Sequence, residues 1–517
     1  MRPLRRPRRR LIAVAGAIVI AVSIAVTGSL LLMRTGIHST SATAPAASAI
    51  PTPASTPSPT FNGLRFPYPG AGPSGKTTVV WWVGLGAGGS EPNQLQAEED
   101  FVSHYNGTNK DNVFLELDIP PGGVPANYTF EDGLAGTDIV GPGESSYLNT
   151  LGDHWLGLDD LIAKNKTDLS VYSQPLRNTF RNPSGQLEGL PYVEFPSFIF
   201  FNKDLFTAAG LPGLPTRVGE QYMGHDWTWD EATIAKQLTV DTSGRTSTEQ
   251  GFNPAKTKSY GFDLQWVSNL RGFATAFGAG SYVAADGKTA QVPAVWGQAA
   301  KWYYDAMWGP HFAPTEAERS APAMSNGTTV GTGRVAMDLA WTWTISSFGP
   351  HDASGNPTST PPTPFKHWDM GVLPSNDGVT TAPIDVDTFV INKDTKNPDA
   401  AYKAMLAIMA DPAMMASYGG MPVDPSYQAA YFKAQQDGVD AQFADNPITW
   451  SVLTEMARYA SPEIQFDPDE TAYVKATNDD QAFYTLLQTK GNLNLDTEIA
   501  RFKATLQADF DAAAAPS

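Results

Sequence analysis

Patterns typical of buried strands alternate with patterns typical of amphipathic helices in the body of the chain, and this alternation restricts the fold more than any other feature. Three short apolar runs predict strands, at Thr77–Val83, Val113–Leu117 and Thr137–Val140. Gln94–Tyr105, between the first two, has the spacing of an amphipathic helix. Alternating strands and helices predict an α/β sheet, in which a ligand lies beyond the carboxyl ends of the strands. Here those ends are the loops 84–93 and 141–146.

Helix and strand signals continue to the end of the chain. Helices are expected at 147–162, 203–210, from Thr228, at 268–277, 294–308, from Pro398 and at 479–515. An extended run is expected at 190–201, strands are expected at 259–264 and in a region ending at Ile391, and a further structural segment begins at 335–340. Thr228 begins a capping box, and Asn397 precedes a proline at the first position of a helix. No fixed-period repeat is visible, which argues against solenoids and propellers.

The N-terminus carries an uncharged apolar segment, Leu11–Met33, directly after six arginines. Only Arg34 lies on its far side, so the positive-inside rule places the N-terminus in the cytoplasm and the rest of the chain outside. The segment is longer than the core of a signal peptide, which favours an uncleaved anchor, with cleavage near Ala47 or Ala49 as the alternative. The Pro-, Ser-, Thr- and Ala-rich stretch after it predicts an extended linker.

Composition and motif context exclude several classes of function. Beyond the first 60 residues the chain has 28 basic and 53 acidic side chains, a net charge of −25, which argues against nucleic acid as a partner. There is no Cys, and the seven His are scattered, so we expect no metal and no cofactor. Two glycine-rich matches, at 70–77 and 84–89, lack the strand-then-helix context of phosphate-binding loops and predict no nucleotide site.

Several segments, taken in order over about residues 76–517, carry a family resemblance. They include VVWWVGLGAGGSEPNQLQAEEDF, GTDIVGPGESSYLNTLGDHWLGLDDLI, GQLEGLPYVEFPSFIFFNKDLFTAAGLP, GRVAMDLAWTWTISSF and FVINKDTKNPDAAYKAMLAIMADPAM. In this order they resemble the extracellular solute-binding proteins of ATP-binding-cassette importers, in particular the maltose-binding-protein-like carbohydrate family. No single segment is specific to this family, but the occurrence of all of them in this order is.

The resemblance implies an α/β, two-lobed periplasmic-binding-protein-like fold, with interleaved lobes joined by hinge crossings and a ligand cleft between the lobes. The crossings would be LPYVEFPSFIFF and Thr381–Ile391. The implied division of the chain is a cytoplasmic Arg-rich segment at 1–10, an anchor or signal segment at 11–33, a linker at 34–75, lobe 1 at 76–192 plus about 388–425, and lobe 2 at about 193–387 plus 426–517.

Sugars present C–H-rich ring faces, so aromatic side chains are the first site candidates. Trp341 matches the position of a sugar-stacking tryptophan in the resembling family, and Trp343 lies on the same face if the chain there is extended. Trp266 follows GFDLQ, where the family places an aromatic residue against the sugar. For Trp341 and Trp343 the alternative is core packing. Pro142 stands where the maltose-type pattern has a stacking tryptophan, which puts maltodextrin specificity in doubt.

Polar candidates for the sugar hydroxyls complete the predicted site. They are Glu194 and Tyr192 in the first crossing, Glu144 and Ser145 after the third strand, and Asp387 with Asp385 in the second crossing. Asp263 is a weaker candidate that could equally end a strand. For Glu194 the alternative is a buried ion pair, and for Asp387 it is a hydrogen bond within the hinge.

The predicted function is a substrate-binding protein, not an enzyme, that captures a sugar or oligosaccharide and delivers it to the permease subunits of an importer. We expect a monomer on the extracellular face of the cell membrane, held there by the N-terminal segment or else secreted. Two alternatives remain open: a glycan-cleaving enzyme, because paired carboxylates beside aromatics also describe a hydrolase, and a sugar-sensing receptor ectodomain.

Overall fold

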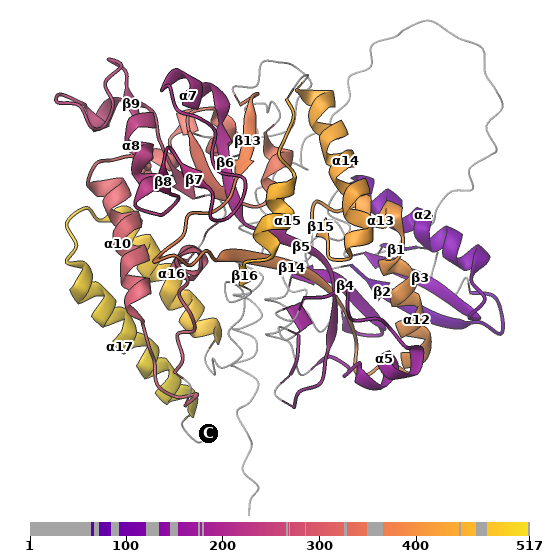
Figure 1. Cartoon of the computed structure of the whole chain (residues 1–517). Coiled ribbons are helices and arrows are strands. Elements are labelled where there is room, and N and C mark those ends of the chain that lie inside the picture. Colours follow the sequence, from indigo (N-terminus) through magenta and orange to yellow (C-terminus); the bar gives the residue numbers. More distant parts are fainter. Residues whose placement is uncertain are drawn as a thin grey trace, which may run out of the picture.

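Two β-sheets of unequal size organise the protein, one in each of two lobes (Figure 1). The structure, a computed structural model, describes residues 64–66, 72–83, 92–119, 134–144, 154–173, 176–177, 180–182, 184–264, 267, 269–284, 286–324, 328–348, 365–443, 446–461 and 473–514. The predicted anchor and linker lie outside these residues. Within them, no helix has both the length and the apolar character that crossing a bilayer requires.

The larger sheet has the strand order β1-β3-β2-β4-β14-β5-β15, with β16 paired to β14. Its strands are β1 (Leu64–Phe66), β2 (Thr77–Trp82), β3 (Val113–Ile119), β4 (Ile139–Glu144), β5 (Gly189–Pro196), β14 (Ala382–Ile391), β15 (Met421–Pro422) and β16 (Ala460–Ser461). Strand β2 is parallel to both β3 and β4, whereas β14 is antiparallel to β4 and β5. The ten residues of β14 are all buried, because neighbouring strands and packed helices enclose it.

Helices α2 (Pro92–Thr108) and α12 (Pro398–Met409) pack on this sheet, and α13 (Pro412–Ser417) packs on α2. The methionines of α12 and α13 are buried and belong to the core. Trp81 and Trp82 belong to separate apolar clusters, as expected for neighbours on opposite faces of a strand. Both rings are buried, so neither offers an exposed surface.

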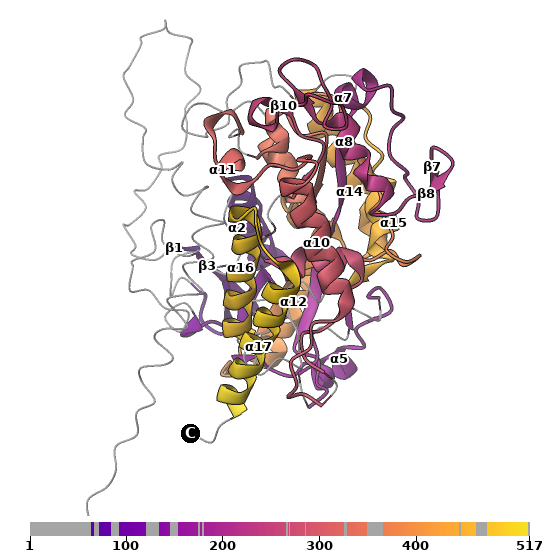
Figure 2. The same ribbon diagram turned by 90° about the vertical axis from the view of Figure 1, so that its left-hand side faces the viewer.

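The smaller sheet has the order β11-β12-β6-β13, from β6 (Phe198–Asn202), β11 (Asp263–Leu264), β12 (Met337–Ala340) and β13 (Trp368–Gly371). Helices α9 (Leu270–Ala274), α10 (Ala294–Trp308), α16 (Tyr473–Thr489) and α17 (Leu495–Ala514) pack against one another beside it (Figure 2). An aromatic cluster fills this lobe, where Trp229 stacks on Phe277 with 4.6 Å between ring centroids.

Most of the remaining described elements are short. They are α5 (Asp159–Asn165), α7 (Lys203–Ala208), β7 (Gln221–Tyr222), β8 (His225–Asp226), η3 (Glu231–Ile234), α8 (Ala235–Leu238), β9 (Val240–Asp241), η4 (Pro254–Lys256), β10 (Thr257–Ser259), η5 (Thr275–Phe277), α11 (Glu316–Arg319), η6 (Pro322–Met324), η7 (Val330–Thr332), η8 (Thr342–Ser347), α14 (Pro425–Gln442) and α15 (Ser451–Ala457).

Within the described residues, two of the chain segments at the junction of the sheets run side by side. Strand β5 of the larger sheet ends at Pro196 and β6 of the smaller sheet begins at Phe198, so Ser197 alone separates them. Strand β14 runs antiparallel to β5, and the amide of Ser197 donates to the carbonyl of Pro383 at 2.9 Å. The two stretches predicted as crossings therefore lie side by side.

Most predicted elements are confirmed, and the differences have local causes. The helix predicted at 147–162 is wrong at its described start, because Trp155 bridges to Asn392 and packs in an apolar cluster, so α5 begins only at Asp159. The loop predicted at 141–146 is wrong for its described part, which completes β4. The tail predicted as helical at 479–515 is helical, in two helices with a break after Thr489.

Smaller differences concern caps and short strands. Thr228 accepts a hydrogen bond from the amide of Glu231, as its capping role requires, but a 3₁₀ turn precedes α8. The predicted strand 259–264 is divided between β10 and β11. Asn397 does precede α12, yet its side chain donates to the carbonyl of Thr78 instead of capping the helix.

Candidate functional site

A row of acidic side chains crosses the larger sheet where the two crossings lie together. Asp387 of β14 is directly opposite Glu144, the last residue of β4. Residues directly opposite each other in an antiparallel pair share a face of the sheet, with Cβ atoms about 5 Å apart. Asp385 is two positions along β14 and so lies on the same face. The register therefore gathers Glu144, Asp385 and Asp387 into one acidic cluster.

This cluster is costly to ionise. Burial and the neighbouring Asp385 raise the pKa of Glu144 from 4.5 to about 8. Burial, Asp385 and Glu144 hold the pKa of Asp387 well above its ordinary value. Asp387 is 2% exposed and Glu144 is partly buried. In the described part of the chain, neither carboxylate forms a hydrogen bond or an ion pair, whereas Asp385 accepts from the amide of Val386 at 2.7 Å.

Glu194 lies on the other face of the same strands. It is directly opposite Val386 of β14 and Met421 of β15, and it therefore alternates with the face that carries Asp385 and Asp387. Burial raises the pKa of Glu194 to about 8, and its carboxylate has no hydrogen-bond partner among the described residues. The sequence placed Glu194 and Asp387 in one site, but the register separates their side chains.

A stacked tryptophan pair adjoins the acidic cluster. Trp341 and Trp343 have ring centroids 5.1 Å apart and planes only 7° from parallel. Trp341 is 1% exposed, and its indole N–H has no partner in the described part of the protein, whereas Trp343 is partly exposed. Trp343 also contacts Phe195 edge-on, with centroids 5.0 Å apart. Phe195 is directly opposite Asp385, so the pair lies on the face of the acidic cluster.

The pair is not the extended segment that the sequence suggested. Trp341 follows β12 and caps the 3₁₀ helix η8, to which Trp343 belongs. Between them, the Thr342 hydroxyl donates to the carbonyl of Gly419 at 2.9 Å, next to β15 of the larger sheet. The Tyr431 hydroxyl of α14 donates to the same carbonyl at 2.9 Å. Phe195, Thr342 and Tyr431 escaped sequence reasoning because no local pattern marks them.

Tyr192 is enclosed in the core of the larger lobe. Its ring makes edge contacts with Phe389 and Tyr418, at centroid distances of 5.2 and 5.6 Å. Burial, followed by the charges of Asp411 and Glu98, holds the pKa of Tyr192 well above its ordinary value. The hydroxyl has no hydrogen-bond partner among the described residues. Tyr192 is therefore a core side chain of the larger lobe.

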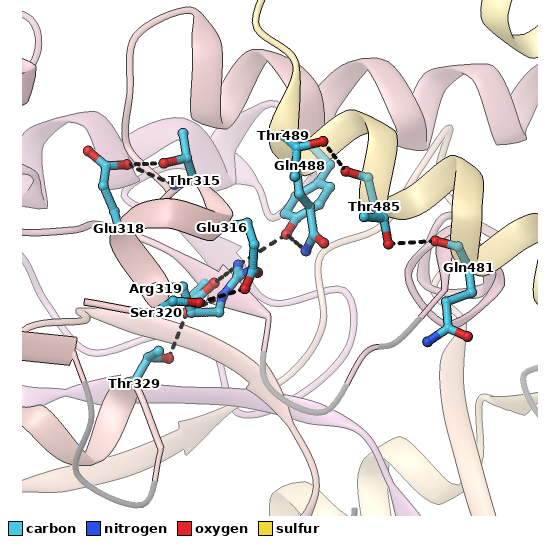
Figure 3. A network of polar contacts seen from close by, with 12 residues as sticks. Thr315, Glu316, Glu318, Arg319, Ser320, Thr329, Gln481, Thr485, Gln488 and Thr489 are labelled. Carbon is cyan, nitrogen blue, oxygen red and sulfur yellow. Dashed lines mark hydrogen bonds and ion pairs between the residues drawn. The ribbon is translucent and has the colours of Figure 1, made fainter. Parts of the chain in front are cut away.

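Asp263, the weaker carboxylate candidate, belongs to a satisfied polar network in the smaller lobe, and Figure 3 shows its partners Arg319 and Thr329. Arg319 donates to it at 2.5 Å and the Thr329 hydroxyl donates at 2.6 Å. Burial alone would lower the pKa of Arg319, but Asp263 and Tyr303 hold it well above its ordinary value. Gln488 of α16 donates to the Tyr303 hydroxyl, which connects the network to the C-terminal helices. Asp263 is therefore occupied by internal partners.

Two predicted site residues, Trp266 and Ser145, lie outside the described residues, as does the glycine-rich loop 84–91. In the part that the structure describes, no three His, Asp or Glu side chains are arranged to hold a metal ion. The acidic cluster and the tryptophan pair together offer hydrogen-bond acceptors beside a flat aromatic face. This combination suits a ligand with several hydroxyl or amine donors and an apolar ring face.

The chain is similar to one known protein family and to several solved structures. The family model described as bacterial extracellular solute-binding protein matches residues 153–416. No curated protein sequence gives a significant match. The structure of UspC from M. tuberculosis is similar, with 16% identity, coverage of 84% of this chain and 100% of that one, and a TM-score of 0.60.

Two further solved structures are similar over most of their length. The cyclic α-maltosyl-1,6-maltose binding protein of Arthrobacter globiformis has 15% identity, coverage of 85% of this chain and 100% of that one, and a TM-score of 0.58. The sugar-binding protein MalE of Xanthomonas citri has 16% identity, coverage of 84% and 98%, and a TM-score of 0.57. These likenesses confirm the predicted two-lobed, periplasmic-binding-protein-like fold.

Proposed function

Since this chain belongs to the bacterial extracellular solute-binding proteins, we propose that it captures a sugar or oligosaccharide outside the cell and delivers it to the permease subunits of an ATP-binding-cassette importer. The observation that carries the proposal is the acidic cluster beside the partly exposed ring of Trp343, at the crossing between the lobes. Two similar structures are described as sugar-binding or maltose-type binding proteins, which supports the same class of solute.

Each residue of the proposed site has a role that fits its surroundings. Trp343 stacks on a sugar ring, and Trp341 supports it from the buried side. Glu144 and Asp387 accept hydrogen bonds from the solute, which supplies the partners that they lack among the described residues. Trp266 and Ser145 are proposed from the sequence alone. Glu194 lies on the opposite face of the strands, and Tyr192 is a supporting core residue, so neither contacts the solute directly.

We also propose that the apolar segment Leu11–Met33 holds the protein at the outer face of the membrane as a monomer, so that the linker after it lets the lobes reach the importer. The full-length protein should then fractionate with membranes in its native host. A mature protein in the medium with its N-terminus between residues 47 and 50 would contradict the anchor but not the binding function.

Isothermal titration of the purified body with a panel of mono-, di- and trisaccharides tests the binding function. Stoichiometric binding without chemical change of the sugar is the expected result, accompanied by a melting temperature that rises with sugar concentration. Product formation during the titration would identify a glycan-cleaving enzyme instead. Absence of binding across the panel at millimolar concentration would overturn the proposal.

A further inference from the structure

The carboxylates of the acidic cluster lie close enough together to repel one another, and a neutral sugar brings no positive charge to offset this repulsion. Asp387 is 2% exposed, directly faces Glu144 and receives no hydrogen bond or cation from any described residue. Like charges directly opposite each other in a sheet repel. A pyranose contributes hydroxyl donors but no charge, so at neutral pH the cluster would have to keep at least one proton to bind it.

The aromatic side chains beside the cluster provide a second, independent observation. Phe195 shares the face of Asp385, and Trp343 packs edge-on against Phe195 while Trp341 stacks behind it. Aromatic faces attract cations through their quadrupole, and Trp is the strongest of them. Carboxylates on one side and an indole on the other form the usual surroundings of a bound ammonium group.

We propose that the solute carries a basic nitrogen, so that the protein binds an amine-bearing sugar in preference to its neutral counterpart. The ammonium lies between Asp387 and Glu144 and the face of Trp343. It donates up to three hydrogen bonds and cancels one carboxylate charge, which no hydroxyl does. This inference rests on the proposed function and narrows its substrate class.

Matched pairs of sugars that differ at one position test the inference directly. The probes are glucose with glucosamine and galactose with galactosamine, each titrated calorimetrically at pH 6.5. In each pair an ammonium replaces a hydroxyl of similar size. N-acetylglucosamine is a further control, since it keeps the nitrogen but has no charge. We expect the amine to bind about 10-fold more tightly or better in at least one pair.

The variant Asp387→Asn should abolish that preference, so that the ratio of amine to neutral affinity in the responding pair falls to about 1, whatever the variant does to the affinity of either sugar alone. The matched control is Asp509→Asn, which changes another buried carboxylate, between α16 and α17, by the same isosteric step. This control should keep the preference of the wild-type protein. A preference that survives Asp387→Asn would overturn the assignment to the acidic cluster.

The outcomes separate this inference from the function on which it rests. Equal or tighter binding of the neutral sugar in every pair would overturn the amine preference and leave the sugar-binding function standing. A failure of both members of every pair to bind, together with a failure of the wider sugar panel, would overturn both.

Discussion

Asp263 in the smaller lobe and Asp387 at the crossing are both buried aspartates on β-strands, yet their surroundings are opposite. Asp263 is 0% exposed and accepts from Arg319 and Thr329 (Figure 3). Asp387 is 2% exposed and faces another acid. A buried carboxylate is tolerated when paired and hydrogen-bonded, and is expensive otherwise. The first residue thus stabilises a lobe, whereas the second is left for an external partner.

Removing the partner of Asp263 gives the largest expected effect. Arg319→Met should lower the free energy of unfolding by about 3–5 kcal/mol, because it leaves an uncompensated buried charge. Urea denaturation measures this change. The double variant Arg319→Met with Asp263→Leu should recover part of the loss. A loss below about 1 kcal/mol in the single variant would remove the contrast with Asp387.

The two stacked tryptophans should separate stability from binding. Trp341→Ala opens a cavity and should cost about 3–5 kcal/mol of stability, because the ring is 1% exposed. Trp343→Ala should instead cost about 2–3 kcal/mol of binding free energy, roughly 30- to 150-fold in affinity, with a small change in melting temperature. Calorimetry and thermal unfolding on both variants provide the measurement. The reverse pattern would place the sugar-contacting ring at Trp341.

Asp387→Asn should raise the melting temperature of the unliganded protein by several degrees at pH 8, opposite in sign to Arg319→Met. The wild-type carboxyl ionises freely in the unfolded chain but not beside Asp385 and Glu144, so ionisation favours unfolding. Asparagine cannot ionise in either state. Differential scanning calorimetry without sugar decides, and a lowered melting temperature would mean that Asp387 has an internal partner after all.

Glu194 should affect only the pH dependence of stability. Its folded pKa of about 8 lies above the ordinary value of 4.5, so its contribution is complete below pH 4.5 and is lost as the pH rises through 8. Glu194→Gln should therefore nearly match the wild type at pH 4.5 and melt higher at pH 8. Parallel melting curves for the two proteins at all pH values would show that Glu194 is already paired.

The fold was readable from the sequence where patterns are local. Alternating strands and helices, the run 190–201 and the helix from Pro398 depend on side-chain spacing, which the sequence displays. Trp155 misled the helix prediction because its bridge to Asn392 joins distant residues. The sequence also did not reveal which face of the sheet carries the Glu194 side chain. That face depends on which residue of β14 lies opposite, and sequence spacing alone does not determine cross-strand register.

The candidate site shows the same division. Its residue types, Trp beside Asp and Glu, were identifiable from chemistry, but the exposure of Trp343 relative to Trp341 depends on η8 bending the chain directly after β12. Phe195 acquires its place only through pairing with Asp385. Sequence thus indicated which side chains suit a sugar, whereas pairing between strands decided which of them face one another.

The single residue between β5 and β6 has a mechanical meaning. Only Ser197 connects the two strands, and its amide is hydrogen-bonded to Pro383. This connection is too short to let the two sheets slide past each other. Relative motion of the lobes must then be angular, with its pivot near this serine. Displacement grows with the radius from a pivot, so the outer ends of the lobes sweep a wide arc while the atoms around Ser197 stay nearly still. A small rotation at the crossing therefore corresponds to a large displacement at the outer ends of the lobes.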